Sequence, residues 1–397
     1  MLTAYDDQGK PVVLYRYSRE EIKRLKSRSF FCPVCQENVY IRAGDQVIPH
    51  FAHFQNSACT ERKGEGEKHR QGKIDLMNWL MEQDIPAVLE YYLPRIQQRA
   101  DILVKWRNRW FALEYQCSSI SREMLIKRTR SYQRMGITPI WISGKKRRAT
   151  SKASKINLTH YERFFFYEWD ARFPPVLYFY NPEDKAILML QQPYPVKSSF
   201  YGTLRRYPLS RISFSHLFQV ERQPDSWIYS SWLNEKIKFR TYRSRFFSHD
   251  DHEFRQWLYQ LGYHPQHLPS AIHLPTPHHF YIKPPPYIWQ SKIVLLFLHP
   301  MPVGSVFSIK QLSHVMNRHN SFSTDLPFVL RSPTPVEEYL HLLCKCGYFD
   351  QIGPDRFRKV RNFTFFKTLE QAFDGDKTLI KFLLSCSSNT SPHCRRR

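Results

Sequence analysis

Residues 100–121 read ADILVKWRNRWFALEYQCSSIS, and this stretch decides the fold. It contains two runs of strand-forming residues on either side of Arg107–Asn108, a pair suited to a two-residue turn because Asn tolerates positive φ. One acid stands inside each run, Asp101 in the first and Glu114 in the second. Carboxylates are depleted in strands because they lose hydration and pack poorly there, so both acids need a partner.

The two-residue turn fixes the register of the predicted hairpin. Trp106 pairs with Arg109, and counting outward from this pair places Asp101 opposite Glu114. Side chains alternate along a strand, so Gln116 lies on the same face as Glu114. Two carboxylates whose Cβ atoms are about 5 Å apart repel each other, whereas a shared Mg²⁺ or Mn²⁺ would reverse the sign of the interaction. The sequence therefore predicts a metal ion between the two acids.

A second interpretation of the hairpin needs no metal. Both acids would be paired with cations on an exposed sheet face, where the nearest candidates are Arg99, Lys105 and Arg109. The hairpin alone leaves both interpretations open. The order of the surrounding elements favours the metal.

The elements around the hairpin are predicted to follow the order α-β-β-β-α-β. Residues 66–83 have apolar side chains at helical spacing, and residues 87–93 read as a strand that precedes the hairpin. A second helix follows, with Ser121 as its N-cap and Gly136 as its stop, and residues 138–143 read as the last strand.

This order, with an acid on the second strand and an acid-x-polar pair on the third, resembles the core of the PD-(D/E)xK nuclease superfamily. The resemblance implies a restriction-endonuclease-like mixed α+β fold in which Asp101 and Glu114 hold Mg²⁺ or Mn²⁺. Gln116 stands where the superfamily usually has Lys, and Gln can orient water but cannot supply a positive charge or take a proton. The first helix offers further catalytic candidates, which otherwise form an ordinary solvated helix surface: Glu65, His69 and Lys73.

A Cys/His cluster precedes the first helix. Cys32 and Cys35 form a CPVC motif, His50 and His53 form HFAH, and Cys59 follows. A C-x-x-C pair lets two thiolates point at one centre, and a second pair after a short hairpin completes a tetrahedral Zn²⁺ site. Five candidates compete for four positions, and one His with Cys59 is the combination that fits the CPVC pair. The alternative for the histidines is a buried aromatic corner without metal.

The charge of the chain points to a polyanionic partner. The 397 residues include 59 Lys and Arg against 35 Asp and Glu, which gives a net charge of +24. Such a field suits nucleic acid first and an anionic membrane surface second, whereas solubility alone seldom needs so large an excess. The first residues lack an apolar run that would serve as a secretory signal, and the longest apolar stretch is too short to span a bilayer. We therefore expect a cytoplasmic protein without membrane insertion.

The motifs along the chain resemble those of the competence protein CoiA family. They are CPVC, HFAH, the spacing of Glu65, His69 and Lys73, RADILV, EYQCSSIS and RTRSYQRMGITPIWI. The resemblance implies a cytoplasmic role in natural transformation, in which a metal-dependent nuclease processes incoming DNA, single-stranded or in recombination intermediates. The alternative is a non-catalytic DNA-binding accessory factor that promotes integration by a recombinase such as RecA. An RNA-binding or ribonuclease protein is a third class.

The resemblance also implies the organisation of the chain. We expect a zinc-finger-like segment at residues 1–62, a nuclease-like domain at 63–155, an extension or linker at 156–220 and a largely helical C-terminal domain at 221–397. By position, the supporting site residues are Ser118, Arg128 and Tyr132.

Aromatic residues of the C-terminal domain are either core residues or platforms for stacked bases, namely Trp257, Tyr259, Tyr281, Tyr287 and Trp289. Four cysteines have no convincing partner set: Cys344, Cys346, Cys386 and Cys394.

Overall fold

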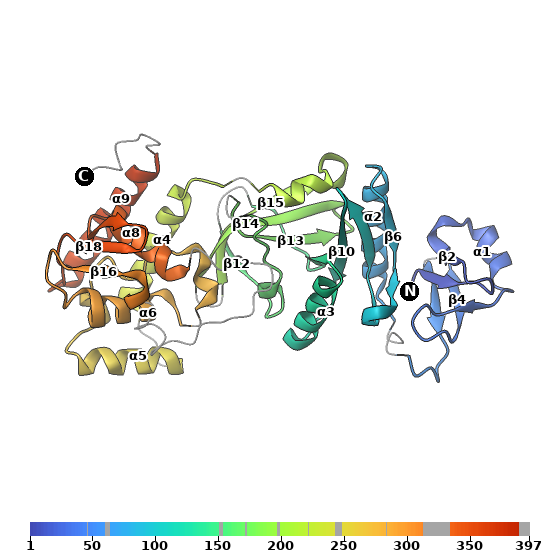
Figure 1. The fold of residues 1–397 in the computed structure, drawn as a ribbon, viewed down its shortest axis with the longest axis horizontal. Helices are drawn as coiled ribbons and strands as arrows, with labels where there is room; N and C mark the ends of the chain where they lie inside the picture. Colours follow the sequence, from blue (N-terminus) through green and yellow to red (C-terminus); the bar gives the residue numbers. More distant parts are fainter. Residues whose placement is uncertain are drawn as a thin grey trace.

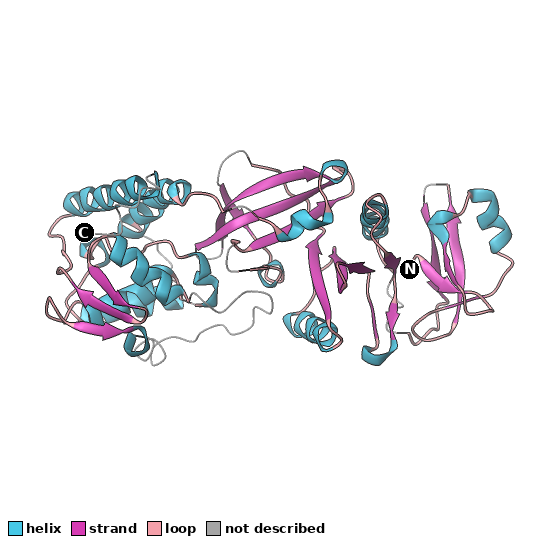
Figure 2. Ribbon diagram, turned by 45° about the horizontal axis from the view of Figure 1, so that its top comes forward, coloured by secondary structure: helices cyan, strands magenta, loops and turns pink. Residues whose placement is uncertain are grey.

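The computed structural model shows three parts arranged in a row along the long axis of the molecule (Figure 1). A small N-terminal sheet lies at one end, a large mixed sheet with helices lies in the middle, and a more helical part lies at the other end (Figure 2). The structure describes residues 1–45, 47–59, 64–150, 154–170, 173–196, 199–220, 222–242, 248–282, 284–312 and 334–388. Tyr281 (for its side chain) and Cys394 lie outside the described residues.

The N-terminal part is a five-stranded antiparallel sheet with the order β2-β1-β3-β4-β5. Its core is a small apolar cluster in which the rings of Phe30 and Phe51 lie 5.0 Å apart. Ser18 starts the helix α1 through a capping box with Glu21. The elements are β1 (Thr3–Tyr5), β2 (Pro11–Val13), α1 (Arg19–Leu25), β3 (Phe30–Phe31), β4 (Asn38–Gly44) and β5 (Val47–His53).

The central part is an eight-stranded mixed sheet with the order β12-β15-β14-β13-β11-β10-β9-β6. Its first half is α2 (Glu67–Met81), β6 (Ala87–Leu89), β9 (Ile102–Trp106), β10 (Arg109–Gln116), α3 (Arg122–Arg134) and β11 (Ile137–Ser143). This is the predicted α-β-β-β-α-β order, interrupted by the short β7 (Tyr92–Leu93) and β8 (Gln98–Arg99). The sheet continues through β12 (Ser154–Asn157), β13 (Val176–Asn181), β14 (Ala186–Val196) and β15 (Ser199–Pro208).

The β9–β10 hairpin has the register that the two-residue turn predicts. Strand pairing runs from Arg109 opposite Trp106 to Leu113 opposite Ile102, and one further step places Glu114 opposite Asp101. The turn residues Arg107 and Asn108 both have positive φ, 46° and 61°. Mirror-image turns of this kind match the right-handed twist of the strands, so the turn keeps the two acids in register.

A glycine brings helix α2 against strand β10. A Cβ atom at Gly72 would lie 2.1 Å from the ring of Tyr115, so only glycine allows the helix to pack this closely. One turn earlier, the ring of His69 stacks with the same tyrosine ring at a centroid distance of 5.6 Å. The contact places the N-terminal half of α2 beside the last residues of β10. Helix α3 follows β10, with Ser121 as its N-cap as predicted.

The C-terminal part contains α4 (Ser226–Thr241), α5 (His249–Gln260), α6 (Pro286–Ile293), α8 (Pro335–Lys345) and α9 (Leu369–Ser388). It also contains a three-stranded sheet of β16 (Val306–Ser308), β18 (Arg356–Lys359) and β17 (Phe349–Gly353). Tyr287 and Trp289 are buried in its core, whereas Tyr259 is exposed. Within the described ranges, no helix combines the length and apolar character needed to cross a membrane.

Candidate active site

A cavity of about 660 Å³ lies where β10 ends and α2 begins. Most of the predicted catalytic residues line it: Glu65, His69, Asp101, Glu114 and Gln116. Ser118 and Arg128 line it as well. Residues from a helix start, two strand ends and the following loop are therefore brought together in one place, as the hairpin register and the packing of α2 on β10 require.

Three side chains in this cavity form a cluster that could hold one metal ion. One oxygen or nitrogen atom each from Glu65, His69 and Asp101 lies within 4.8 Å of the others. The Nε2 atom of His69 is 3.5 Å from Oδ1 of Asp101 and 3.9 Å from Oε1 of Glu65. The backbone N–H of Tyr115 donates to the second oxygen of Asp101 over 2.8 Å, which fixes the carboxylate at the edge of the hairpin.

The charges of this cluster depend on one another. Burial by itself would raise the pKa of Asp101, but the neighbouring His69 and Lys73 lower it well below its usual range. Burial by itself would lower the pKa of His69, but the Asp101 carboxylate raises it to about 10. Asp101 is therefore ionised, and His69 carries a proton that a metal ligand must give up.

Lys73 lies beneath the cluster and is fully buried. Its Nζ atom is 2.5 Å from Oε2 of Glu65 and 3.8 Å from Oδ1 of Asp101, and it also donates to the carboxylate of Glu90. Arg99 binds the other oxygen of Glu65 over 3.1 Å. Lys73 is thus the cation around which three acids gather, and its surroundings differ from a solvated helix surface.

Glu90 is a residue of this network that the sequence pattern did not reveal. It has positive φ, 52°, and forms the turn that splits the predicted strand at residues 87–93 into β6 and β7. Its carboxylate accepts the backbone N–H groups of Leu2 (2.6 Å) and Thr3 (3.0 Å) in addition to Lys73. Glu90 therefore links strand β1 of the N-terminal sheet to the buried lysine. No motif or residue spacing around Glu90 in the sequence indicates that it contacts Lys73.

Glu114 is held on the other side of the cavity by helix α3. Arg128 donates to its carboxylate over 2.7 Å, and the Tyr132 hydroxyl donates as well. Burial raises the pKa of Glu114 to about 7, against the opposing effect of Arg128. Both residues were expected only as supporting members of the site, and the structure places them directly on Glu114.

Each hairpin acid therefore has its own cationic partner. Asp101 faces His69 and Lys73 from α2, and Glu114 faces Arg128 from α3, so a shared metal is not needed to explain their burial. The sequence-based salt-bridge interpretation named other partners, but Lys105 and Arg109 are exposed at the far end of the hairpin. Metal binding by Asp101 and Glu114 stays a prediction, and the described geometry groups Asp101 with Glu65 and His69 instead.

Gln116 lines the cavity at the end of β10. Its Nε2 atom donates to the carbonyl oxygen of Ser118 over 2.9 Å and to the Ser118 hydroxyl over 3.2 Å. These bonds fix the orientation of the amide. Among the described residues no donor bonds its Oε1 atom, which therefore faces the cavity as an acceptor for water or substrate.

A second metal-capable cluster lies in the N-terminal sheet. Its ligand atoms lie within 4.8 Å of one another and come from Cys32, Cys35, His53 and Cys59. The Sγ atom of Cys35 is 3.4 Å from Nε2 of His53. Three thiols and one imidazole fit the usual ligand set of a tetrahedral structural Zn²⁺ site. The fifth candidate, His50, lies outside the cluster, because it stands three residues before His53 on β5 and so points to the opposite face of the strand. Its Nδ1 atom bonds the carbonyl oxygen of Ile48 over 2.8 Å.

Comparison with known proteins agrees with this arrangement along the chain. Residues 14–62, 65–222 and 228–373 match, respectively, the N-terminal domain, the nuclease-like domain and the C-terminal domain described for competence protein CoiA. A curated relative, Competence protein CoiA from Bacillus subtilis (strain 168), is 30% identical over 338 residues, which cover 83% of this chain and 89% of the relative. The chain belongs to the competence protein CoiA family. The resemblance noted from its motifs is thereby confirmed. No solved structure matches the chain.

Family membership also bears on the domains. The nuclease-like match runs to residue 222 and includes β12 to β15, which the sheet likewise joins to β11. The cavity with Asp101 lies within this nuclease-like domain. The Cys₃His cluster lies within the N-terminal domain of the family.

Proposed function

We propose that this protein is a metal-dependent DNA nuclease of the PD-(D/E)xK type that processes transforming DNA. The observation that carries the proposal is the cluster of Glu65, His69 and Asp101 inside a cavity of the nuclease-like domain. The net charge of +24 and the role implied by the name of the family favour DNA as the substrate.

The charges of the site favour uptake of a cation once His69 is neutral. Four acids, of which Glu90 and Glu114 are buried and Glu65 and Asp101 are partly buried, face three permanent cations (Lys73, Arg99 and Arg128). When Glu114 is ionised, a protonated His69 balances the charges of these side chains, and loss of the His69 proton leaves them with a net negative charge. Bound there, Mg²⁺ or Mn²⁺ would supply Lewis acidity toward a phosphodiester.

The remaining roles belong to the chain itself. Asp101 and Glu65 hold carboxylate oxygens toward the cavity, Arg128 presents a guanidinium group to its edge, and the Oε1 atom of Gln116 orients a water molecule. Gln116 cannot take the proton of that water. Glu114, whose pKa of about 7 leaves it partly ionised at neutral pH, is the carboxyl group in the cavity suited to accept it.

A cleavage assay tests this proposal. Full-length protein is incubated with single-stranded, duplex and branched DNA over a titration of Mg²⁺ and Mn²⁺. We expect metal-dependent cleavage that Asp101→Asn and Glu65→Gln reduce by more than the roughly 10- to 100-fold that loss of an outer-shell partner of a metal site typically costs. Glu67→Gln is the matched control, because Glu67 is exposed two residues from Glu65 and does not line the cavity. Wild-type protein that binds DNA but cuts none of these substrates with either metal refutes the enzyme.

A non-catalytic DNA-binding accessory factor is the second candidate, and one observation favours it. Lys73 occupies the space between Glu65, Glu90 and Asp101, where its ammonium group already neutralises the acids. In that case Asp101→Asn leaves transformation intact, while loss of basic surface residues lowers it. An association with the recombinase RecA belongs to this candidate and is tested by co-purification of the two proteins with single-stranded DNA.

A further inference from the structure

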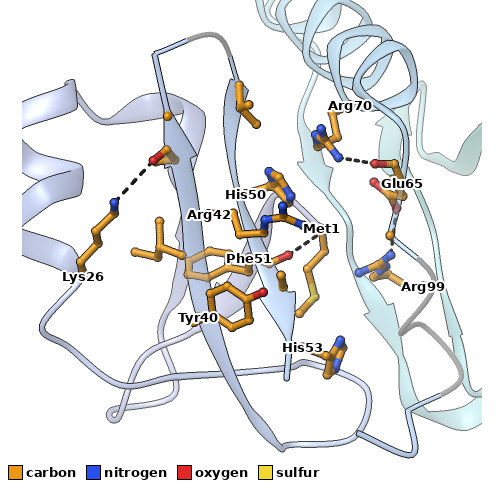
Figure 3. Close-up of a pocket in the computed structure, with 16 residues that line it drawn as sticks. Met1, Lys26, Tyr40, Arg42, His50, Phe51, His53, Glu65, Arg70 and Arg99 are labelled. Atoms are coloured by element: carbon orange, nitrogen blue, oxygen red, sulfur yellow. Dashed lines mark hydrogen bonds and ion pairs between the residues drawn. The ribbon is translucent and has the colours of Figure 1, made fainter. Parts of the chain in front are cut away.

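A second cavity, of about 780 Å³, lies between the N-terminal sheet and helix α2. One wall is the β4–β5 ribbon, and the other is the start of α2 with Arg99 (Figure 3). Gly64, Glu65 and Arg99 line both this cavity and the one that contains Asp101. The two cavities therefore adjoin, and a ligand in the second lies beside the proposed catalytic cluster.

The walls of the second cavity are strongly basic. Lys26, Arg42, Arg70 and Arg99 line it, and Glu65 is the acid among its lining residues. Arg42 is exposed and has no carboxylate partner among the described residues. His50 stands directly opposite Arg42 in the strand pairing, and Arg70 faces both from α2 (Figure 3).

Arg70 is the residue that marks a binding site. Its side chain is buried, with 7% of the residue exposed, and its Nε atom has no hydrogen-bond partner among the described residues. Its recorded side-chain bond goes to the backbone carbonyl oxygen of Glu65 and not to a carboxylate. Burial lowers the pKa of Arg70; the carboxylates of Glu65 and Glu67 oppose this effect, and the nearby Arg42 adds to it. An anion between the two guanidinium groups would relieve their repulsion and bind the unused donor.

An exposed pair of aromatic rings extends the same surface. Tyr40 lines the cavity and lies on the same face of β4 as Arg42, two residues away. Its ring is 5.0 Å from that of Phe54, and the two residues are 40% and 56% exposed. Phe54 directly follows His53, so the Cys₃His cluster fixes the end of the strand that presents this pair. Unpaired bases stack on such rings, whereas the bases of a duplex are already stacked and paired.

We propose that this groove binds single-stranded DNA and leads it to the cavity that contains Asp101. Arg42 and Arg70 bind its phosphates, and Tyr40 and Phe54 stack its bases. The N-terminal domain then acts as the substrate-binding arm of the protein. That the bound DNA continues into the cavity with Asp101 rests on the proposed function. Binding of DNA in the groove does not, and it is measured without cleavage.

Binding is measured by fluorescence anisotropy with a labelled single-stranded oligonucleotide of about 20 nucleotides, full-length protein and no added Mg²⁺ or Mn²⁺. We expect Arg42→Ala to weaken binding and to reduce the slope of log K against log salt by about 0.7, the value for one phosphate contact on a single strand. Tyr40→Ala should weaken binding by about tenfold without changing this slope, because stacking involves no counterion release.

Arg24→Ala is the matched control, since Arg24 is an exposed arginine of the same domain that does not line the cavity. Arg70→Lys retains a charge in place of the buried guanidinium and guards against misfolding, which is checked by thermal unfolding. If Arg42→Ala weakens binding of the oligonucleotide no more than Arg24→Ala does, the proposal that the groove binds single-stranded DNA is refuted, whether or not the wild type cleaves DNA. Preferential binding of duplex DNA, or of RNA of the same length, also overturns the proposal. Intact binding without any cleavage would leave the groove supported and refute only the nuclease.

Discussion

His278, between two acids, joins the central part of the chain to the C-terminal part. Its removal is the perturbation whose size the structure gives most directly. The Nε2 atom of His278 is 3.1 and 3.2 Å from the two carboxylate oxygens of Glu168, and its Nδ1 atom is 2.5 Å from Glu338. Burial by itself would lower the pKa of His278, but the two carboxylates raise it to about 9. The folded protein therefore stabilises the protonated, imidazolium form of His278.

The sign of the pH dependence follows from this shift. The folded-state pKa of about 9 lies above the ordinary value of 6.5, so the contribution of His278 to stability is complete below pH 6.5 and is lost as the pH rises to 9. A shift of this size corresponds to about 3 kcal/mol, at about 1.4 kcal/mol for each pKa unit. For a folding unit of about 150–250 residues, a loss of about 3 kcal/mol lowers the unfolding temperature by roughly 6–12 °C.

Thermal unfolding of the full-length protein at pH 6.5 and 9.5 measures this effect. We expect His278→Gln to unfold at a lower temperature than the wild type at pH 6.5 and to differ from it by much less at pH 9.5. Other groups that titrate in this range are common to both proteins, so the difference isolates His278. His252→Gln is the control, because His252 is exposed on α5 and should behave as the wild type does. An equal gap between His278→Gln and wild type at both pH values refutes the reasoning.

Two further predictions concern the N-terminal cluster and the packing of α2. We expect zinc to copurify with the wild type and with His50→Ala, because His50 lies outside the ligand cluster, but not with Cys32→Ser; metal analysis of the purified proteins decides this. Gly72→Ala should destabilise the protein by about 1–3 kcal/mol, because the added methyl group overlaps the ring of Tyr115 at 2.1 Å; denaturant unfolding measures it, and a neutral result contradicts the packing.

The sequence was most informative where local chemistry determines geometry. The register of the β9–β10 hairpin followed from the turn at Arg107 and Asn108, because a two-residue turn leaves no freedom in the pairing. His69 and Lys73 lie one turn apart on α2, as helical spacing predicted, whereas Glu65 precedes the helix, which begins at Glu67, and joins the cluster from the loop before it. These features depend on neighbours in the sequence.

The partners of the acids depend on distant elements and could not be predicted in the same way. Arg128 reaches Glu114 because α3 folds back over the sheet, and alternation along a strand contains no information about that side chain. Glu90 reaches Lys73 from a turn with positive φ, a conformation that the aromatic run around it did not suggest. From the sequence, a metal ion was the simplest way to offset the repulsion between Asp101 and Glu114. The structure offsets it with cationic side chains from helices α2 and α3.

The proposed nuclease activity requires that Glu65, His69 and Asp101 bind a divalent cation. Isothermal titration calorimetry with Mn²⁺ on the full-length protein, with zinc left in place, tests it directly. We expect saturable Mn²⁺ uptake by the wild type and by Glu67→Gln, and loss of this uptake in Asp101→Asn. Wild-type protein that takes up no Mn²⁺, or equal uptake by Asp101→Asn, would contradict this expectation.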